Sequence, residues 1–554
     1  MNSQSKTVNV ASRLAEVAKE MPDDVAVVEP LKYDRQGKRQ YRVVSFQELD
    51  RDSDRIARGL RELGVKPGTR LALLVRPGID FVSLVFGFYK SGAVVVLIDP
   101  GMGRKNLIKC LVDAEPEGFV AVSSVHAVRT LLRRRFAGAK LNVTVGRRWF
   151  WGGVTLQQLR GGPWTAPELT PTAADDPAAI IFTTGSTGPP KGVLYRHGNF
   201  DAQVEQIQTF YDIKAGEVDL PGFPLFGLFN CAMGVTTVIP DMDPSRPAMV
   251  DPRKIIEAAR DWHVTQTFGS PAIWNKVGHY CQEQGIRMDS IRRVLSAGAP
   301  VPADVLERMK NCINPEGQIH TPYGATESLP VASVSDGEVL GETAEKTAQG
   351  KGVCVGGKFP GIKWKVIRIV DGPIESIDKI EELPDGEIGE LLVTGPVVTR
   401  EYCTRRESNA LAKVADGPAV WHRMGDVGYL DSQQRFWVCG RMAHRVLTDQ
   451  GPMYTLPCEA IVNCHPAVFR SALVGVGSPD SQRPVMVIQP HEDDMPQTDQ
   501  QREALLGEIR ELAAANPLTE AIDCFLLHPS FPVDIRHNAK IFREKLSVWA
   551  AERV

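Results

Sequence analysis

The chain has 554 residues, which is too many for a single hydrophobic core, so we expect two or more domains. Hydrophobic residues make up 43% and charged residues 24%, as in ordinary globular proteins, and the net charge of −3 gives no reason to expect nucleic-acid binding. The ten cysteines form no C-x-x-C pair, which argues against a zinc site and favours free thiols in a reducing cytoplasm.

We expect neither a targeting signal nor a membrane span in the first hundred residues. Residues 1–20 are polar and lack the apolar core of a signal peptide. The most apolar stretch, residues 81–100, is interrupted by a Lys-Ser-Gly run. We therefore expect a core helix followed by a buried strand at residues 93–98, and no transmembrane helix.

Helical patterns then alternate with short β-branched runs. Four of these runs are typical of buried strands: residues 71–75, 94–98, 179–183 and 293–296. The alternation predicts an α/β protein with layered, largely parallel sheets. Residues 386–402 differ, because turn residues and short alternating strands there predict a small antiparallel β region.

The last part of the chain predicts a domain of its own. Beyond Gly440, about 110 residues hold two expected strands, at 471–476 and 485–488, and one expected helix at 501–515. We therefore predict a large N-terminal domain of residues 1–440 and a small, mobile C-terminal α/β domain of residues 441–554.

A loop rich in glycine and hydroxyl groups, TTGSTGPPK at residues 183–191, follows an apolar strand-like run. Glycine allows backbone N–H groups to approach an anion closely, hydroxyl groups add donors, and lysine adds a positive charge. The residues concerned are Thr183, Thr184, Gly185, Ser186, Thr187, Gly188 and Lys191. The loop predicts a phosphate cradle, although it does not match a Walker loop.

This loop resembles the phosphate signature of the acyl-adenylate-forming superfamily, which includes acyl-CoA synthetases, peptide-synthetase adenylation domains and luciferases. Further matching segments follow in the family's order: GFPLFGLF at 222–229, SAGAP at 296–300, YGATE at 323–327, GDVGYL at 425–430 and GR at 440–441. The resemblance covers nearly the whole chain. It implies the adenylate-forming fold and the use of ATP and Mg²⁺ to activate a carboxylic acid in the cleft between the two domains.

The resemblance also implies roles for the matching residues. Residues 222–229 would line an acyl pocket, and the segment Gly298, Ala299 and Pro300 would pack against adenine. Tyr323, next to Gly324, would stack on adenine, and Thr326 would touch the α-phosphate.

The remaining implied roles are electrostatic. Glu327 would help to hold Mg²⁺, because a carboxylate is a suitable ligand for a hard cation. Asp426, in a turn, would accept hydrogen bonds from both ribose hydroxyls. Arg441 would be a second ribose or phosphate contact at the start of the hinge.

A lysine near the C-terminus completes the resemblance. Residues 538–546, NAKIFREKL, match the family's terminal motif except for alanine in place of glycine at 539. The small domain would bring Lys540 to the carboxylate and the α-phosphate, where a cation stabilises the transition state. Lys540, Thr184, Lys191 and Glu327 form the predicted catalytic set.

The hinge departs from the wider family. Ala443 stands where an acid or lysine is usual, and the next glycine comes one residue late, as Gly451. Residues 444–466 and 533–546 instead resemble the β-lactone synthetases of bacterial long-chain olefin biosynthesis. Such enzymes use ATP to close 2-alkyl-3-hydroxy fatty acids, so the resemblance implies an acyl-AMP that is attacked by its own 3-hydroxyl.

Several alternatives stay open. A long-chain acyl-CoA or acyl-AMP ligase would use the same adenylation residues, whereas a nucleotide-binding scaffold in a complex of pathway enzymes would not need them. His197 and His444 are candidates for the base in ring closure. Basic and aromatic residues at 133–135 and 147–153 indicate either a solvated helix with a core strand, or a partner surface, a peripheral membrane contact or an entry for lipid.

Overall fold

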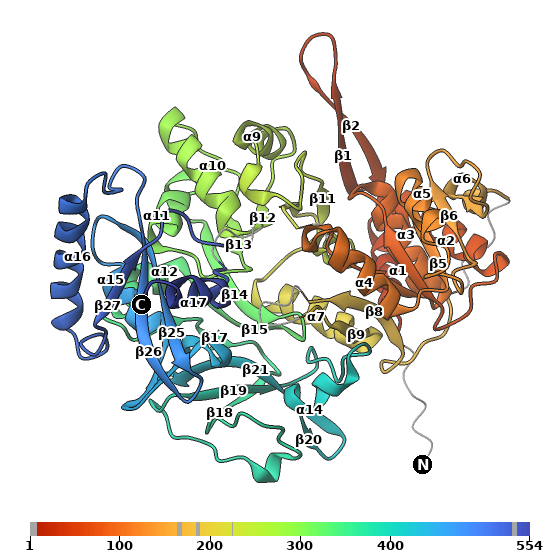
Figure 1. The fold of residues 1–554 in the computed structure, drawn as a ribbon. Helices are drawn as coiled ribbons and strands as arrows, with labels where there is room; N and C mark the ends of the chain where they lie inside the picture. The colour runs from red at the N-terminus through yellow and green to blue at the C-terminus, as the bar shows by residue number, and fades with distance from the viewer. Residues whose placement is uncertain (1–7, 163–168, 184–188, 224, 534–539) are drawn as a thin grey trace.

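The computed structural model describes residues 8–162, 169–183, 189–223, 225–533 and 540–554, and it confirms the predicted α/β class (Figure 1). The described residues form two large sheets, one six-stranded antiparallel sheet, and a three-stranded and a two-stranded sheet in the C-terminal part.

The first large sheet has seven strands in the order β7-β6-β5-β3-β4-β8-β9 and is parallel except for the β8–β9 pair. Its strands are β3 (Arg70–Leu74), β4 (Val94–Leu97), β5 (Gly118–Val122), β6 (Val143–Val145), β7 (Val154–Thr155), β8 (Pro177–Phe182) and β9 (Gly192–Arg196). Its helices are α1 (Ala11–Glu20), α2 (Phe46–Glu62), α3 (Ile79–Ser91), α4 (Arg104–Ala114), α5 (Ser123–Leu131) and α6 (Leu156–Arg160). The three strands expected in this region are confirmed.

Helix α3 is the predicted core helix, and it is buried along nearly its whole length. Its lysine does not break the core, because Lys90 Nζ lies 2.6 Å from a carboxylate oxygen of both Asp50 and Asp54 on α2. A buried charge is tolerated when it is paired and hydrogen-bonded in this way.

The second large sheet has nine strands in the order β17-β15-β14-β13-β12-β10-β11-β1-β2. Its strands are β1 (Val25–Tyr33), β2 (Arg39–Ser45), β10 (Val218–Pro221), β11 (Thr236–Val238), β12 (Gln266–Gly269), β13 (Arg293–Ser296), β14 (Gln318–Ala325), β15 (Ser328–Ser335) and β17 (Gly357–Lys358). Its helices are α7 (His197–Phe210), α8 (Phe226–Met233), α9 (Pro252–Asp261), α10 (Pro271–Gln284) and α11 (Ala303–Cys312). Strands β12, β13 and β14 are parallel, so their carboxyl ends meet at one edge, where ligands bind in open α/β sheets.

The third sheet is antiparallel, as predicted for residues 386–402. Its strands are β16 (Val353–Cys354), β18 (Lys363–Ile367), β19 (Gly389–Thr394), β20 (Lys413–Asp416), β21 (Ala419–Leu430) and β22 (Phe436–Arg441), with the short helices α12 (Asp336–Glu338), α13 (Ala344–Ala348) and α14 (Asn409–Ala412) nearby in the chain. The expected turn at residues 425–430 is wrong, because these residues lie within β21. Gly425 has φ +66° and a β-bulge follows at Val427, so glycines that suggest a turn instead bend a strand.

The C-terminal part contains the strands and helix expected from the sequence. Its elements are β23 (Val446–Thr448), β24 (Gly451–Met453), β25 (Val468–Ser478), β26 (Ser481–Pro490), β27 (Cys524–Leu527), α15 (Thr455–Val462), α16 (Asp499–Ala514) and α17 (Arg543–Ala551). Leu473, Ile488 and Ile509 belong to a core that these elements share. The boundary between residues 440 and 441 stays a prediction.

All ten cysteines are unpaired, as expected. Among the described residues, none of the helices combines the length and apolar character that crossing a bilayer requires.

The buried Asp219 on β10 predicts a pH dependence of stability. Asn230 Nδ2 donates to its carboxyl group at 2.6 Å, and burial raises its pKa from 3.8 to about 7. Between pH 4 and pH 7 the unfolded chain ionises this group while the folded chain keeps it neutral, so its contribution to stability falls as pH rises.

We therefore expect Asp219→Asn to stabilise the protein at pH 8 by on the order of 2–4 kcal/mol and to have little effect at pH 4, because each pKa unit corresponds to about 1.4 kcal/mol. Thermal denaturation at several pH values measures this, with the exposed Asp289→Asn as control. An equal shift in Tm at both pH values would contradict the assignment.

Candidate functional site

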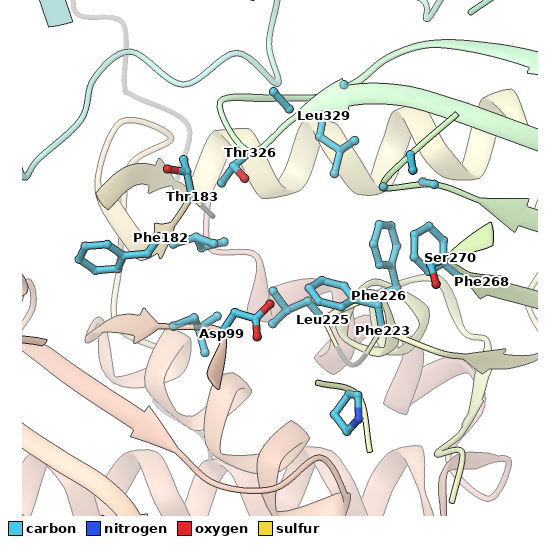
Figure 2. A pocket seen from close by; sticks show the side chains of 18 of the residues that line it. Asp99, Phe182, Thr183, Phe223, Leu225, Phe226, Phe268, Ser270, Thr326 and Leu329 are labelled. Atoms are coloured by element: carbon cyan, nitrogen blue, oxygen red, sulfur yellow. The ribbon is translucent and has the colours of Figure 1, made fainter. Parts of the chain in front are cut away.

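A cavity of about 2440 Å³ brings together the predicted site residues that the structure describes. Its walls include Thr183, Lys191, Gly298, Ala299, Pro300, Tyr323, Gly324, Thr326, Glu327, Asp426, Arg441 and Lys540. Five predicted residues, Thr184, Gly185, Ser186, Thr187 and Gly188, lie outside the described residues. Segments that are far apart in sequence therefore meet around one space. Figure 2 shows two of these residues, Thr183 and Thr326, in a close view of the pocket.

The glycine-rich loop leaves and re-enters the seven-stranded sheet at one point. Thr183 N donates to Lys191 O at 3.0 Å, and Lys191 N donates to Thr183 Oγ1 at 3.3 Å. These bonds continue the antiparallel β8–β9 pair, so the two ends of the loop are held side by side at the cavity wall. Lys191 Nζ lies 4.9 Å from the ring centroid of Tyr402, within the range of a cation–π contact.

Thr326 and Glu327 form the tip of the hairpin between β14 and β15. Tyr402 Oη donates to Glu327 Oε1 at 2.6 Å, and the backbone N–H and hydroxyl of Thr399 both donate to Glu327 O at 2.9 Å. Burial and the Glu327 carboxylate raise the pKa of Tyr402, so the phenol keeps its proton and remains a donor. The orientation of the carboxylate is therefore fixed at the cavity wall.

Asp426 lies directly opposite Arg441 in the β21–β22 pair. Arg441 Nη1 donates to Asp426 Oδ1 at 2.9 Å, and Tyr323 Oη donates to Asp426 Oδ2 at 2.5 Å. The carboxylate raises the pKa of Arg441, and burial with the carboxylate raises that of Tyr323. A carboxylate has about four acceptor sites, so Asp426 can still accept two further bonds.

The part of the cavity wall that contains Lys540 comes from the C-terminal part of the chain. Lys540, Arg543 and His444 line it, and α17 begins at Arg543. The buried Glu459 accepts from Arg543 Nη2 at 2.8 Å and from Leu473 N at 2.8 Å. This ion pair anchors the chain three residues after Lys540 and so limits where its side chain can reach.

The two histidines considered as bases differ. His197 is fully buried, does not line the cavity, and accepts from Val10 N at 3.4 Å. Burial lowers the pKa of His197 to about 4, so the ring stays neutral. Because His197 lies outside the cavity wall, it cannot be the base for ring closure. His444 lines the cavity, and burial with the nearby Arg543 lowers its pKa to about 4.

Helix α8 begins at Phe226, and the residues of this segment that line the cavity, as the resemblance implies, are Gly222, Phe223, Leu225, Phe226, Leu228 and Phe229. Phe226 stacks on Phe268 with ring centroids 3.6 Å apart. In Figure 2, Phe223, Leu225, Phe226 and Phe268 gather on one side of the hollow. This side is apolar and fits a hydrocarbon chain.

Tyr402 and Lys413 were not recognised from the sequence, because an isolated tyrosine or lysine carries no spacing signal. Lys413 Nζ donates to Thr399 O and lies 5.8 Å from the Tyr402 ring centroid. Burial lowers the pKa of Lys413 to about 7, which reduces its positive charge at neutral pH. Tyr402 thus lies between Glu327 and two lysines.

The basic and aromatic segment at residues 147–153 is mostly exposed. Trp149 is 62% and Phe150 is 78% exposed, so the core-strand interpretation is wrong for these two residues. Trp151 is buried and donates to Thr144 Oγ1 at 3.0 Å. A peripheral membrane contact stays a prediction.

Comparison with known proteins agrees with this geometry. Residues 14–403 match the AMP-binding enzyme family. The olefin beta-lactone synthetase of Xanthomonas campestris pv. campestris is 45% identical over 552 residues, covering 98% of each chain, and that of Stenotrophomonas maltophilia is 44% identical, covering 99% of each. The solved amide bond synthetase McbA from Marinactinospora thermotolerans has the same fold, with a TM-score of 0.78 and 20% identity over 98% of this chain and 99% of that one. The chain therefore belongs to the AMP-binding enzyme family, as an ATP-dependent adenylate-forming ligase related to the olefin β-lactone synthetases.

Proposed function

We propose that this ligase activates a long-chain 2-alkyl-3-hydroxy acid as its acyl-AMP and closes it to a β-lactone, releasing AMP and pyrophosphate. The observation that carries the proposal is the single cavity, which joins the polar wall of Glu327 and Asp426 to the apolar wall of α8. The full-length similarity to two olefin beta-lactone synthetases supports the choice of reaction.

In the first step, a carboxylate oxygen of the acid attacks the α-phosphorus of ATP, and pyrophosphate leaves. Negative charge grows on the phosphate oxygens as this happens. We assign Lys540 to the α-phosphate and Lys191, with the hydroxyl groups of the loop that begins at Thr183, to the leaving phosphates. Fixed cations at such positions stabilise the transition state because they need no reorganisation during the reaction.

We assign the nucleoside to another part of the same cavity. Asp426 has acceptor sites left for the two ribose hydroxyls, and Arg441 holds it in place from the neighbouring strand. Tyr323 offers an aromatic face to adenine, next to the segment 298–300.

The residues present fit one Mg²⁺ ion held largely by the substrate. The Glu327 carboxylate lines the cavity with one oxygen fixed by Tyr402. Among the residues that the structure describes, no three acidic, His or Cys side chains gather to hold a metal by themselves. Mg²⁺ is usually bound by one or two carboxylates together with substrate phosphates and water, and it would neutralise phosphate charge here.

In the second step, the 3-hydroxyl oxygen attacks the acyl carbon, AMP leaves with one carboxylate oxygen, and the hydroxyl proton passes to water. The attack is unimolecular, and favourable proximity contributes up to about 7–11 kcal/mol, which offsets part of the strain of a four-membered ring. The substrate supplies its own nucleophile, so no thiol is required. Ten unpaired thiols are consistent with a reducing cytoplasmic setting.

The product without coenzyme A tests this function. We expect mass spectrometry to detect β-lactone and AMP in equal amounts when the enzyme receives ATP and a long-chain 2-alkyl-3-hydroxy acid only. A matched acid without the 3-hydroxyl serves as control and should give acyl-AMP but no lactone. Thioester formation with added coenzyme A, and no lactone from the hydroxy acid, would instead establish an acyl-CoA ligase.

The role of Lys540 predicts a selective loss of adenylation. Lys540→Ala should lower pyrophosphate release on the order of 10²–10³-fold, because one charge contact to the transition state is lost, while ATP still binds. The exposed Lys545→Ala, on the same segment, is the matched control. Pyrophosphate release within twofold of the unmodified enzyme would show that Lys540 is misassigned.

A further inference from the structure

Two groups of apolar residues, which we call arms, line the cavity. The first, which we call the α8 arm, is lined by Phe223, Leu225, Phe226 and Phe229. The second, which we call the α4–α5 arm, is lined by residues of α4 and α5 together with Phe119 and Phe136, whose ring centroids lie 5.1 Å apart. The segments 222–229 and 104–136 are distant in sequence, yet both line the same cavity.

The α4–α5 arm is built from two apolar helix faces. On α4, Leu107, Ile108 and Leu111 follow the spacing i, i+1, i+4, and on α5, Val125 and Val128 are three residues apart, so each set shares one face. Both sets line the cavity.

Leu107, Ile108 and Val125 are only half-buried although they line an interior space. Within the part of the chain that the structure describes, these faces are not fully covered. Burying apolar surface is favourable, so a hydrocarbon ligand would gain free energy in this arm.

The cavity that both arms line also contains the polar wall, which includes Thr183, Thr326 and Glu327. Figure 2 shows Asp99, Phe182 and Thr183 on one side of the hollow and Leu225 and Phe223 on another, with Thr326 nearby. Thr183 starts the loop proposed to hold phosphate, so the reacting carboxyl group would lie in this same cavity.

In a 2-alkyl-3-hydroxy acid, the carbon next to the carboxyl group carries one alkyl chain and the following carbon carries the rest of the main chain. The two chains therefore diverge within two bonds of the reacting group and need two separate channels that begin there. A cavity of about 2440 Å³ exceeds the roughly 300–1,000 Å³ of pockets for drug-sized ligands, which leaves room for both chains and the nucleotide.

We propose that the α4–α5 arm binds one of the two alkyl chains while the α8 arm binds the other, so that this enzyme selects acids that branch at carbon 2. The inference rests on the proposed function. It assigns a hydrocarbon-binding role to α4 and α5, which carry none of the residues predicted to bind ATP.

The test uses one bulky substitution in each arm and three acids. Val125→Trp narrows the α4–α5 arm and Leu225→Trp narrows the α8 arm. The acids carry two long chains, a long main chain with a 2-methyl group, or a short main chain with a long 2-alkyl group. The readout is kcat/KM for ATP-dependent pyrophosphate release, with the exposed Leu131→Trp on α5 as matched control.

We expect each arm variant to lose kcat/KM for the doubly long acid by about 10–100-fold, since each methylene kept out of an apolar site costs about fourfold. Each variant should retain activity on one of the two acids that carry a single long chain. The acid that one variant still uses should be the acid that the other variant has lost. Ile108→Phe, on α4, should reproduce the pattern of Val125→Trp. Retained activity on one acid also shows that the variant is folded.

If Val125→Trp and Ile108→Phe both have the same kcat/KM values for the three acids as Leu131→Trp, the α4–α5 arm holds no chain and the proposal fails. The proposal also fails if Val125→Trp and Leu225→Trp lose kcat/KM on the same acids. Pyrophosphate release does not require ring closure, so this pattern is read independently of the product. Unmodified enzyme that turns these acids into thioesters would overturn the β-lactone function without changing the result for the arms.

Discussion

The register between β21 and β22 is the constraint on which the site depends most. It places Asp426 opposite Arg441, and Tyr323 reaches the same carboxylate from the nine-stranded sheet. One carboxylate therefore joins two sheets, and its partner Arg441 is the last residue of β22, the strand that leads into the C-terminal part. A one-residue slip in this pair would turn Asp426 to the other face of the sheet and remove the acceptor from the cavity.

The same arrangement explains how one cavity can serve two kinds of chemistry. Charged groups lie on the wall formed by the glycine-rich loop, the β14–β15 tip and β21, whereas phenylalanine and aliphatic side chains line the walls at α8, α4 and α5. Charge contacts are strongest where water is excluded, and hydrocarbon around the acyl group excludes it. An acyl-AMP formed at this border is protected from hydrolysis while the internal hydroxyl attacks.

Much of this could be predicted from the sequence, for identifiable reasons. Buried strands such as β13 and the apolar helix α3 follow from hydrophobic periodicity, and the loop at residues 183–191 follows from its composition. Tyr402 and Lys413 could not be found this way, because only tertiary folding brings them to Glu327. Gly425 was taken for part of a turn because a left-handed glycine inside a bulged strand looks the same in sequence. His197 was a candidate only because burial cannot be read from one histidine.

The central claim is that the enzyme activates the carboxylate, and not the hydroxyl, of its substrate. The direct measurement uses a 2-alkyl-3-hydroxy acid labelled with ¹⁸O in both carboxylate oxygens, with mass spectrometry of AMP and lactone after a single turnover. The account predicts one ¹⁸O in AMP and one in the lactone, because the carboxylate oxygen that attacks phosphorus leaves with AMP. Unlabelled AMP together with lactone that retains both labels would show that the 3-hydroxyl was activated, and would contradict the account.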